Sequence, residues 1–225
     1  INRYSDDEID EFFIYFLRSK FAKTVGDTRK FDRNYHRAIF LPEVDQELKL
    51  QHSPKDVKRF LLNEFRYYTE LYHKILTYYD KPHDDYLAVY YNALTEMDSQ
   101  FQLILSACTL NDPEEQEKIK LISREVDRLF SLLQLQKSYD SNDFNETTYL
   151  ISSEIRGQDI ATIKSVFDKY LLIMLSDARG VQTAHPITYS FFKDTGIELN
   201  KRFKRYFFAR IEQFIADQTK MNMKH

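Results

Sequence analysis

Glu70 and His73 have the spacing that comes closest to a metal site in this sequence. The pattern Glu-x-x-His places two ligands on one helix face, which is how ferritin-like bundles present them. A dinuclear site needs a second such pair and two further carboxylates, but no other histidine follows a glutamate by three positions. Pairing on a helix surface explains the two residues better, and we predict no metal site. A metal-dependent helical-bundle enzyme built around Glu70 and His73 is kept as the weakest of three hypotheses, of which the other two follow below. Metal analysis of the purified protein would test it.

The remaining candidates for catalysis are incomplete. His83, Asp84 and Asp85 follow Pro82 and precede a predicted helix, where acidic side chains commonly cap the helix and interact with its dipole. Cys108 has no cationic neighbour in sequence, and no Gly-x-Ser-x-Gly or His-Glu-x-x-His motif occurs. Four glycines, scattered singly, cannot form a phosphate-binding loop. We therefore predict that the chain is not an enzyme and has no catalytic residues and no cofactor.

One stretch contains the ingredients of nucleic-acid binding, the sequence KRFKRYFFARIEQF at residues 201–214. Aromatic rings that stack on bases and cations that contact phosphates together hold single strands. At about 100° between successive residues of a helix, Tyr206 and Arg210 flank one apolar stripe, formed by Leu199, Phe203, Phe207, Ile211 and Phe214. The other cations fall largely on another face, so we expect the rings to pack in the core. The candidates for contact with the DNA backbone are Lys201, Arg202, Lys204 and Arg205.

The composition is that of a globular helical protein. The chain has 225 residues, of which 43% are hydrophobic and 30% charged, with only 4 glycines and 5 prolines. Because turns and hairpins use most glycines, so few of them predict few turns and long helices. The net charge of −3, from 32 Lys and Arg against 35 Asp and Glu, gives no overall attraction to nucleic acid. Any such contact would depend on a local patch.

Several features point to the cytoplasm. Cys108 cannot form an internal disulfide and lies in an apolar run, as a buried cysteine in a reducing compartment does. No apolar run approaches the ~18 residues of a membrane-spanning helix, and no signal peptide precedes the first predicted helix. We predict a cytoplasmic protein without membrane contact. Because the sequence begins with Ile1 rather than Met, we also expect an excerpt of a longer protein.

Helical periodicity and capping signals divide the chain into about eight or nine helices. The clearest signal is Ser53 followed by Pro54, which opens a long helix to about Tyr79. Further helices are expected from Ser5, over 31–40 until Pro42, over 86–108, from Asn111 or Asp112 to Gln136, from an Asn145 cap to Gly157, over 159–179 until Gly180, from Pro186 to Gly196, and over the basic stretch. No segment alternates long enough for a strand, and no linker or repeat divides the chain. We predict an all-α multi-helix bundle with no sheet, in a single helical domain over residues 1–225.

Two stretches resemble a known family. RLFSLLQLQKSYDSNDFNETTYLISSEIR, from Arg128 to Arg156, and KRFKRYFFARIEQFIADQTKMNMKH at the end resemble the helical region of GmrSD-like proteins, which are modification-dependent restriction and phage-defence nucleases. In that family a ParB-like nucleotide-binding domain with an Asp-Gly-Gln-Gln-Arg motif precedes the helical region, and a His-Asn-His nuclease domain follows it. Neither motif occurs in this sequence, so no catalytic residue of the family can be assigned to it.

The resemblance implies a non-catalytic helical scaffold that links a nucleotide-binding domain to a nuclease domain. Its partners would be the flanking domains of the same polypeptide, with DNA as a further one. The parent protein would then be a nucleotide-dependent DNA endonuclease, cut here before its active site. The second hypothesis is a free-standing helical module that binds a protein partner through an aromatic-rich groove. The gene sequence beyond both ends of the chain would discriminate between the two.

Overall fold

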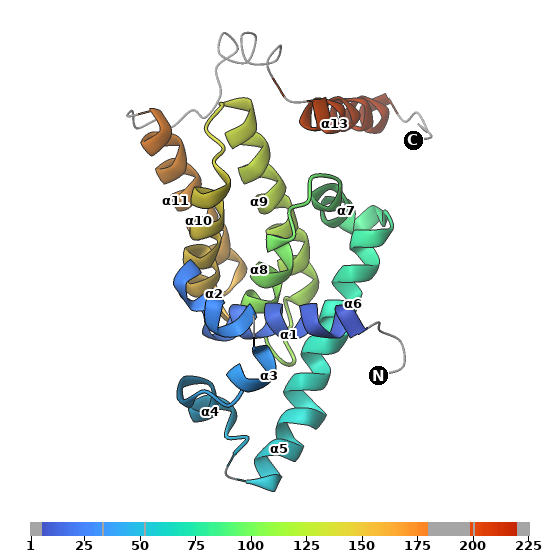
Figure 1. Cartoon of the computed structure of the whole chain (residues 1–225). Coiled ribbons are helices and arrows are strands. Elements are labelled where there is room, and N and C mark those ends of the chain that lie inside the picture. Colours follow the sequence, from blue (N-terminus) through green and yellow to red (C-terminus); the bar gives the residue numbers. More distant parts are fainter. Residues whose placement is uncertain (1–5, 33, 52, 180–198, 200, 220–225) are drawn as a thin grey trace.

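The computed structural model of the chain describes residues 6–32, 34–51, 53–179, 199 and 201–219 (Figure 1). Every regular element in these ranges is a helix, and none is a strand. The predicted all-α, multi-helix fold is therefore confirmed. The structure has more helices than the eight or nine predicted, because several predicted helices are divided. The helix predicted from Pro186 to Gly196, its preceding stop at Gly180, and the cap at Ser5 lie outside the described residues.

The N-terminal region contains one long helix and three short ones. Helix α1 (Asp6–Phe21) buries Phe12 and Phe16 as its periodicity predicts, and Phe13 is half-buried against the same core. The single helix predicted over 31–40 is wrong. The chain instead forms α2 (Val25–Asp32), α3 (Tyr35–Ala38) and α4 (Pro42–Leu48). Pro42 opens α4 because a proline at the first helical position has no N–H that needs an intrahelical partner.

The long helix predicted after Ser53 is present, with one irregularity. The Ser53 hydroxyl accepts a hydrogen bond from the backbone N–H of Asp56 at 3.3 Å, and Pro54 occupies the first turn. The helix runs through α5 (Pro54–Phe60), the π-helical segment η1 (Leu61–Phe65) and α6 (Arg66–Asp80). The π-helical segment has a wider turn than an α-helix, and Leu61 and Leu62 at its start are exposed.

The helix predicted over 86–108 is divided in two. A short 3-10 segment η2 (Asp84–Tyr86) leads into α7 (Leu87–Leu94), and α8 (Ser99–Ala107) follows after a turn. In that turn Glu96 has a φ of 58°, a left-handed conformation that a continuous helix does not allow. Gln100 to Ala107 are all buried, so α8 is the central helix of the bundle. A helix that is buried all round shows no amphipathic stripe, so its periodicity does not reveal the break.

Several polar side chains in the core bond across helix crossings. The Asn92 amide donates to Gln100 Oε1 and to the Ser123 carbonyl, at 3.0 Å each. At a second crossing, the Ser106 hydroxyl lies 2.7 Å from that of Ser152 and 3.1 Å from the Ser19 carbonyl oxygen that it bonds. The serines at this crossing come from α1, α8 and α10, and their small size allows the three backbones to approach closely.

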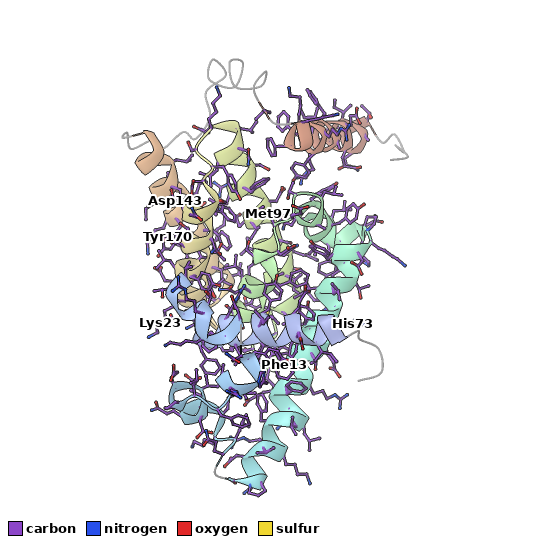
Figure 2. All side chains as sticks on the ribbon, in the orientation of Figure 1. Phe13, Lys23, His73, Met97, Asp143 and Tyr170 are labelled. Carbon is purple, nitrogen blue, oxygen red and sulfur yellow. The ribbon has the colours of Figure 1, made fainter. Side chains whose placement is uncertain are left out.

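Helix α9 (Glu115–Leu135) packs against α7, α8 and α11 (Ile160–Arg179). Helix α10 (Ser141–Glu154) packs against α8 and α11, and α6 packs against α7 and α8 (Figure 1). Side chains fill the space between these helices (Figure 2). Asp140, and not the predicted Asn145, caps α10, since it accepts the backbone N–H of Asn142 at 2.8 Å and of Asp143 at 3.1 Å. Gly157 follows the end of α10 and has a φ of 63°, a left-handed conformation that glycine adopts readily. This agrees with its predicted role as the stop of this helix.

Candidate functional site

The basic and aromatic stretch forms helix α13 (Lys201–Thr219), which lies across one end of the bundle, near α7 and α9 (Figure 1). Two apolar residues hold its beginning. Leu199 and Phe203 are buried, and the Phe203 ring meets the ring of Phe130 on α9 edge to face, with the ring centroids 5.7 Å apart. Such an aromatic pair stabilises the fold by more than the burial of its apolar surface alone. The first turn of α13 is therefore part of the core.

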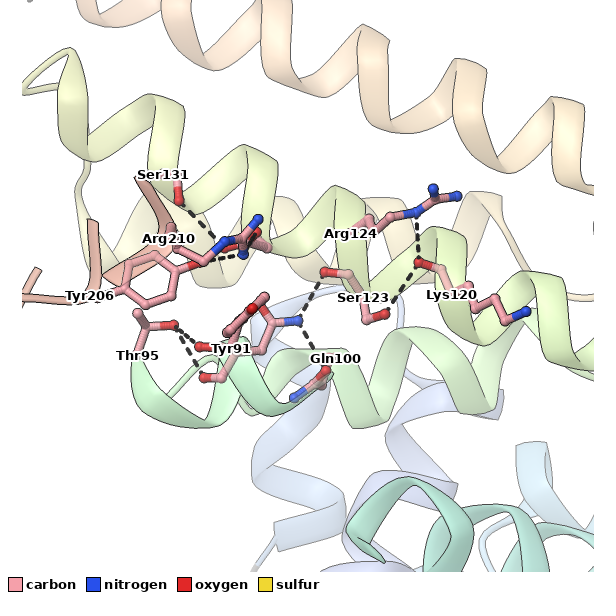
Figure 3. A network of polar contacts seen from close by, with 11 residues as sticks. Tyr91, Thr95, Gln100, Lys120, Ser123, Arg124, Ser131, Tyr206 and Arg210 are labelled. Carbon is pink, nitrogen blue, oxygen red and sulfur yellow. Dashed lines mark hydrogen bonds and ion pairs between the residues drawn. The ribbon is translucent and has the colours of Figure 1, made fainter. Parts of the chain in front are cut away.

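A polar cluster fixes α13 one turn further on. The carboxylate of Asp127 on α9 accepts hydrogen bonds from the Tyr206 hydroxyl and, at 2.6 Å, from Nη1 of Arg210 (Figure 3). The Arg210 guanidinium also lies over the ring of Tyr91 on α7, with its carbon 4.0 Å from the ring centroid. Ser131 donates to the same carboxylate at 3.5 Å. We call Tyr91, Asp127, Tyr206 and Arg210 the α13 clamp.

Burial and the neighbouring charges affect the pKa of two members of the clamp, Tyr206 and Arg210. Burial and then the charge of Asp127 raise the pKa of Tyr206, so this phenol stays protonated and donates. Burial by itself would lower the pKa of Arg210. The interactions with Asp127 and Tyr206 are stronger than this effect, so the pKa of Arg210 is raised. A buried carboxylate is stable only when such partners satisfy it. Arg210 is thus committed to the fold and is not available for a phosphate.

The buried face of α13 differs from the predicted stripe. Phe203, Tyr206 and Ala216 are buried, whereas Ile211 is 38% and Phe214 63% exposed. Phe207 is half-buried. The prediction that all the rings pack in the core is therefore wrong for Phe214, and also for Phe208, which is 55% exposed. The first part of the predicted stripe does pack on the bundle, since Leu199 and Phe203 are buried and Phe207 is half-buried, and only its later members Ile211 and Phe214 are exposed.

A groove runs between α13 and the end of α7. It has a volume of about 500 Å³, and its lining residues are Leu94, Lys201, Arg205, Tyr206 and Ala209. Leu94 is 42% exposed and gives the groove an apolar floor. Lys201 and Arg205 are exposed and have no carboxylate partner in the part of the chain that the structure describes. The groove therefore combines apolar surface with unpaired positive charge.

Two of the four residues predicted to contact phosphate, Lys201 and Arg205, therefore lie together at this groove. Lys204 is half-buried, and the side chain of Arg202 lies outside the described residues. The sequence reasoning missed the groove wall from α7 and the clamp residue Asp127. The available signal was the pair Tyr206 and Arg210, four residues apart on one helix face, but nothing in the sequence marks Asp127 as their partner.

Of the side chains considered for catalysis, Asp84 and Asp85 line a pocket together with Arg210 of α13. Glu70 accepts a hydrogen bond from Arg66 Nε at 2.8 Å on the exposed face of α6, which is the helix-surface pairing expected. His83 caps η2 through Nδ1, which accepts the backbone N–H of Asp85 at 3.3 Å. Cys108 is buried as predicted, and burial raises the pKa of its thiol to about 12. Within the described ranges, no group of three or more His, Cys, Asp or Glu side chains is placed to hold a metal ion.

Comparison with known proteins adds no relative. No model of a protein family, no curated protein and no solved structure matches the chain. No helix in the described ranges combines the length and apolar character that crossing a membrane requires. The geometry of α13 and its groove is therefore the basis for a functional proposal, together with the two stretches that resemble a family.

Proposed function

We propose that this chain is a non-catalytic helical scaffold of a GmrSD-like restriction or defence nuclease, where it joins a nucleotide-binding domain to a His-Asn-His nuclease domain. The two stretches that resemble this family contact each other in the structure. Phe130 belongs to the first stretch and Phe203 to the second, and their rings form the edge-to-face pair at the start of α13. This contact supports a single unit that presents α13 in a fixed orientation.

The outward surface of α13 is the observation that carries the proposal. The clamp and Phe203 hold the first turns of the helix on the bundle, and apolar side chains further along it are exposed. These are Phe208, Ile211, Phe214 and Ile215, each between 38% and 63% exposed. Contiguous exposed apolar side chains commonly mark a surface that another protein or domain covers. Contacts between domains of one chain are of this kind. A helix anchored at its first turns, with exposed apolar side chains further along, is suited to holding a following domain in place.

The activity of the complete gene product tests this role. We expect the complete product to cleave DNA in a nucleotide-dependent manner, while the isolated 225-residue chain hydrolyses neither nucleotide nor DNA. Replacing Phe214 with Ser should reduce cleavage by the complete product. Leu62→Ser is the matched control, because Leu62 is 59% exposed on η1, far from α13 along the bundle. Hydrolysis by the isolated chain would rule out a pure scaffold.

A free-standing interaction module remains the second candidate, and the groove favours it. An apolar floor with two cations at its rim matches a partner segment that carries apolar and acidic side chains. The gene sequence separates the two candidates. Nuclease and nucleotide-binding motifs on either side of the chain support the scaffold, and an open reading frame without them supports the module.

DNA-backbone contact by Lys201 and Arg205 is a separate part of the proposal. Each phosphate contact releases counterions, so the double variant Lys201→Ala and Arg205→Ala should weaken duplex binding and reduce the salt dependence by roughly two contacts. Lys55→Ala with Lys58→Ala is the control, since both lysines are exposed on α5 at the other end of the molecule (Figure 1). Equal binding by both double variants would assign Lys201 and Arg205 to the solvated surface.

A further inference from the structure

A second cavity lies at the turn between α7 and α8 and shares no lining residue with the groove. It has a volume of about 240 Å³ and lies between α1, the connection from α7 to α8, and the first turns of α10. Met97, labelled in Figure 2, belongs to its lining. No part of the scaffold role uses this cavity.

Two buried polar atoms at the cavity have no hydrogen-bond partner among the residues that the structure describes, the Ser99 hydroxyl and Nε2 of Gln102. Gln102 is only 2% exposed. Its neighbour Gln100, equally buried, has both amide atoms bonded, to Asn92 and to the Val89 carbonyl. A buried amide without a partner is costly, so a native structure that keeps one calls for an explanation. The two atoms together offer hydrogen-bond donors to a molecule in the cavity.

The charges around the cavity disfavour an anion. Arg18 is already neutralised by Asp32, which accepts from its Nε at 2.9 Å and from its Nη2 at 2.6 Å. Asp98 and Glu96 both line the cavity, and Asp98 accepts a hydrogen bond from the Tyr79 hydroxyl at 2.5 Å through Oδ1. The second oxygen of Asp98 remains an acceptor for a ligand N–H. A neutral ligand with both a carbonyl and an amino group suits this arrangement.

Aromatic rings complete the lining. Tyr15 comes from α1, whereas Tyr139 and Phe144 come from the region where α10 begins. The ring centroids of Tyr139 and Phe144 lie 5.6 Å apart. Aromatic rings with a few convergent polar groups are typical of sites for flat heterocycles. Burial, and then the charge of Asp98, raises the pKa of Tyr15, so its hydroxyl remains a proton donor.

We propose that this cavity binds a nucleobase, with a ring carbonyl accepting from Gln102 and Ser99, an amino group donating to Asp98, and the flat face against the aromatic side chains. The base comes either from a free nucleoside or from an unpaired position of a single strand. Both sources present the same ring chemistry. The inference is independent of the scaffold role, because neither α13 nor a flanking domain takes part.

Titration calorimetry with the four common ribonucleosides tests the proposal, and an unstructured oligonucleotide serves as competitor. At least one nucleoside should bind the wild-type chain, and Gln102→Leu should weaken that binding about tenfold, the loss expected for one or two hydrogen bonds. Ser99→Ala should weaken it by a smaller factor. Competition by the oligonucleotide identifies an unpaired base as the source, and its absence identifies the free nucleoside.

Gln136→Leu is the matched control. Gln136 is also 2% exposed and also has unpartnered amide atoms, but it does not line the cavity. It should bind nucleoside like the wild type, which separates a general effect of removing a buried amide from the loss of a ligand contact. Far-UV circular dichroism confirms that each variant is folded. The proposal is overturned if no nucleoside binds at millimolar concentration, or if folded Gln102→Leu and Ser99→Ala bind as tightly as the wild type.

Discussion

At the residue scale, half-buried basic side chains bond carbonyl groups near helix ends. Arg156 donates to the Ser19 carbonyl at 2.7 Å and to that of Ala22 at the end of α1. Lys20 donates to the Leu105 carbonyl at 2.8 Å and to that of Cys108 at 3.5 Å at the end of α8. The last carbonyls of a helix need such donors. These bonds join residues far apart in sequence, so no local pattern predicts them.

Lys20 makes the stability of the fold depend on pH. Burial lowers the pKa of Lys20 to about 7, from an ordinary value near 10.5 that it regains on unfolding. Between these values the unfolded chain binds the proton and the folded chain does not, so the free energy of unfolding rises with pH from about 7 upward. Nearby Cys108 works in the opposite direction above about pH 9, because burial raises the pKa of its thiol to about 12.

The change in stability between pH 7 and 9 therefore reports the ionisation of Lys20. The charges of Arg156, Glu47 and Glu64 also affect the pKa of Lys20. We expect the free energy of unfolding, measured with urea at each pH, to increase by roughly 1 to 2 kcal/mol across this window. The variant Lys20→Met should remove most of that increase. A wild type as stable at pH 7 as at pH 9 would show that Lys20 is charged throughout the window.

The pair Lys118 and Asp112 gives a second prediction at this scale. Their side chains are 5% and 3% exposed, the ion pair measures 2.7 Å, and Lys118 also donates to the Ala107 carbonyl at 3.3 Å. Lys118→Met leaves a buried carboxylate without its cation and should cost about 3 kcal/mol in the free energy of unfolding. Lys120→Met is the control on the same helix, because its pair with Glu117 is more exposed and should contribute less than about 1 kcal/mol. Equal losses in the two variants would contradict this account.

At the element scale, the sequence predicted helices well where a strong signal marks the end. Ser53 and Pro54 place the start of α5 correctly, and the α11 boundaries agree with the prediction to within one residue. It failed at the break between α7 and α8, because α8, which is buried on all sides, has no stripe of its own to mark where it starts. For α13 it was correct for Leu199 and Phe203 and failed for Ile211 and Phe214. The apolar pattern does not show how far along α13 the bundle extends.

The α13 clamp should therefore control the local stability of this helix. Arg210→Met removes the ion pair and the contact with Tyr91, and should lower the opening free energy of α13 amides by about 2 kcal/mol in hydrogen exchange. The 36% exposure of the Arg210 side chain keeps the expected loss below that of a fully buried pair. Arg205→Met, on the exposed side of α13, should leave exchange unchanged. Equal protection of α13 in both variants would show that Phe203 alone holds the helix.

At the scale of the whole molecule, the all-α class followed from composition, but the packing did not. Few glycines and helical periodicity predict long helices, and the structure has them. The crossing of α1, α8 and α10 depends on Ser19, Ser106 and Ser152, which are fully buried although serine is usually exposed. The groove and the second cavity likewise form from residues of several helices. Their assembly is a property of the tertiary fold and has no signature at any one position.

At this scale, the proposed scaffold role requires that another domain cover the exposed apolar side chains of α13, Phe208, Ile211, Phe214 and Ile215. A thiol placed there reports its accessibility, since the only native cysteine, Cys108, is buried and has a raised pKa. Phe214→Cys introduces the reporter in the apolar surface, and Leu62→Cys introduces a matched one on η1. Both parent side chains are well exposed in this chain, at 63% and 59%.

The most direct measurement is the rate of thiol labelling at these two positions, in the isolated chain and in the complete gene product. We predict equally fast labelling of both in the isolated chain. In the complete product, labelling at position 214 should slow at least about tenfold, the effect of burial in a domain contact, while position 62 stays fast. Unchanged labelling at position 214 in the complete product would contradict the scaffold.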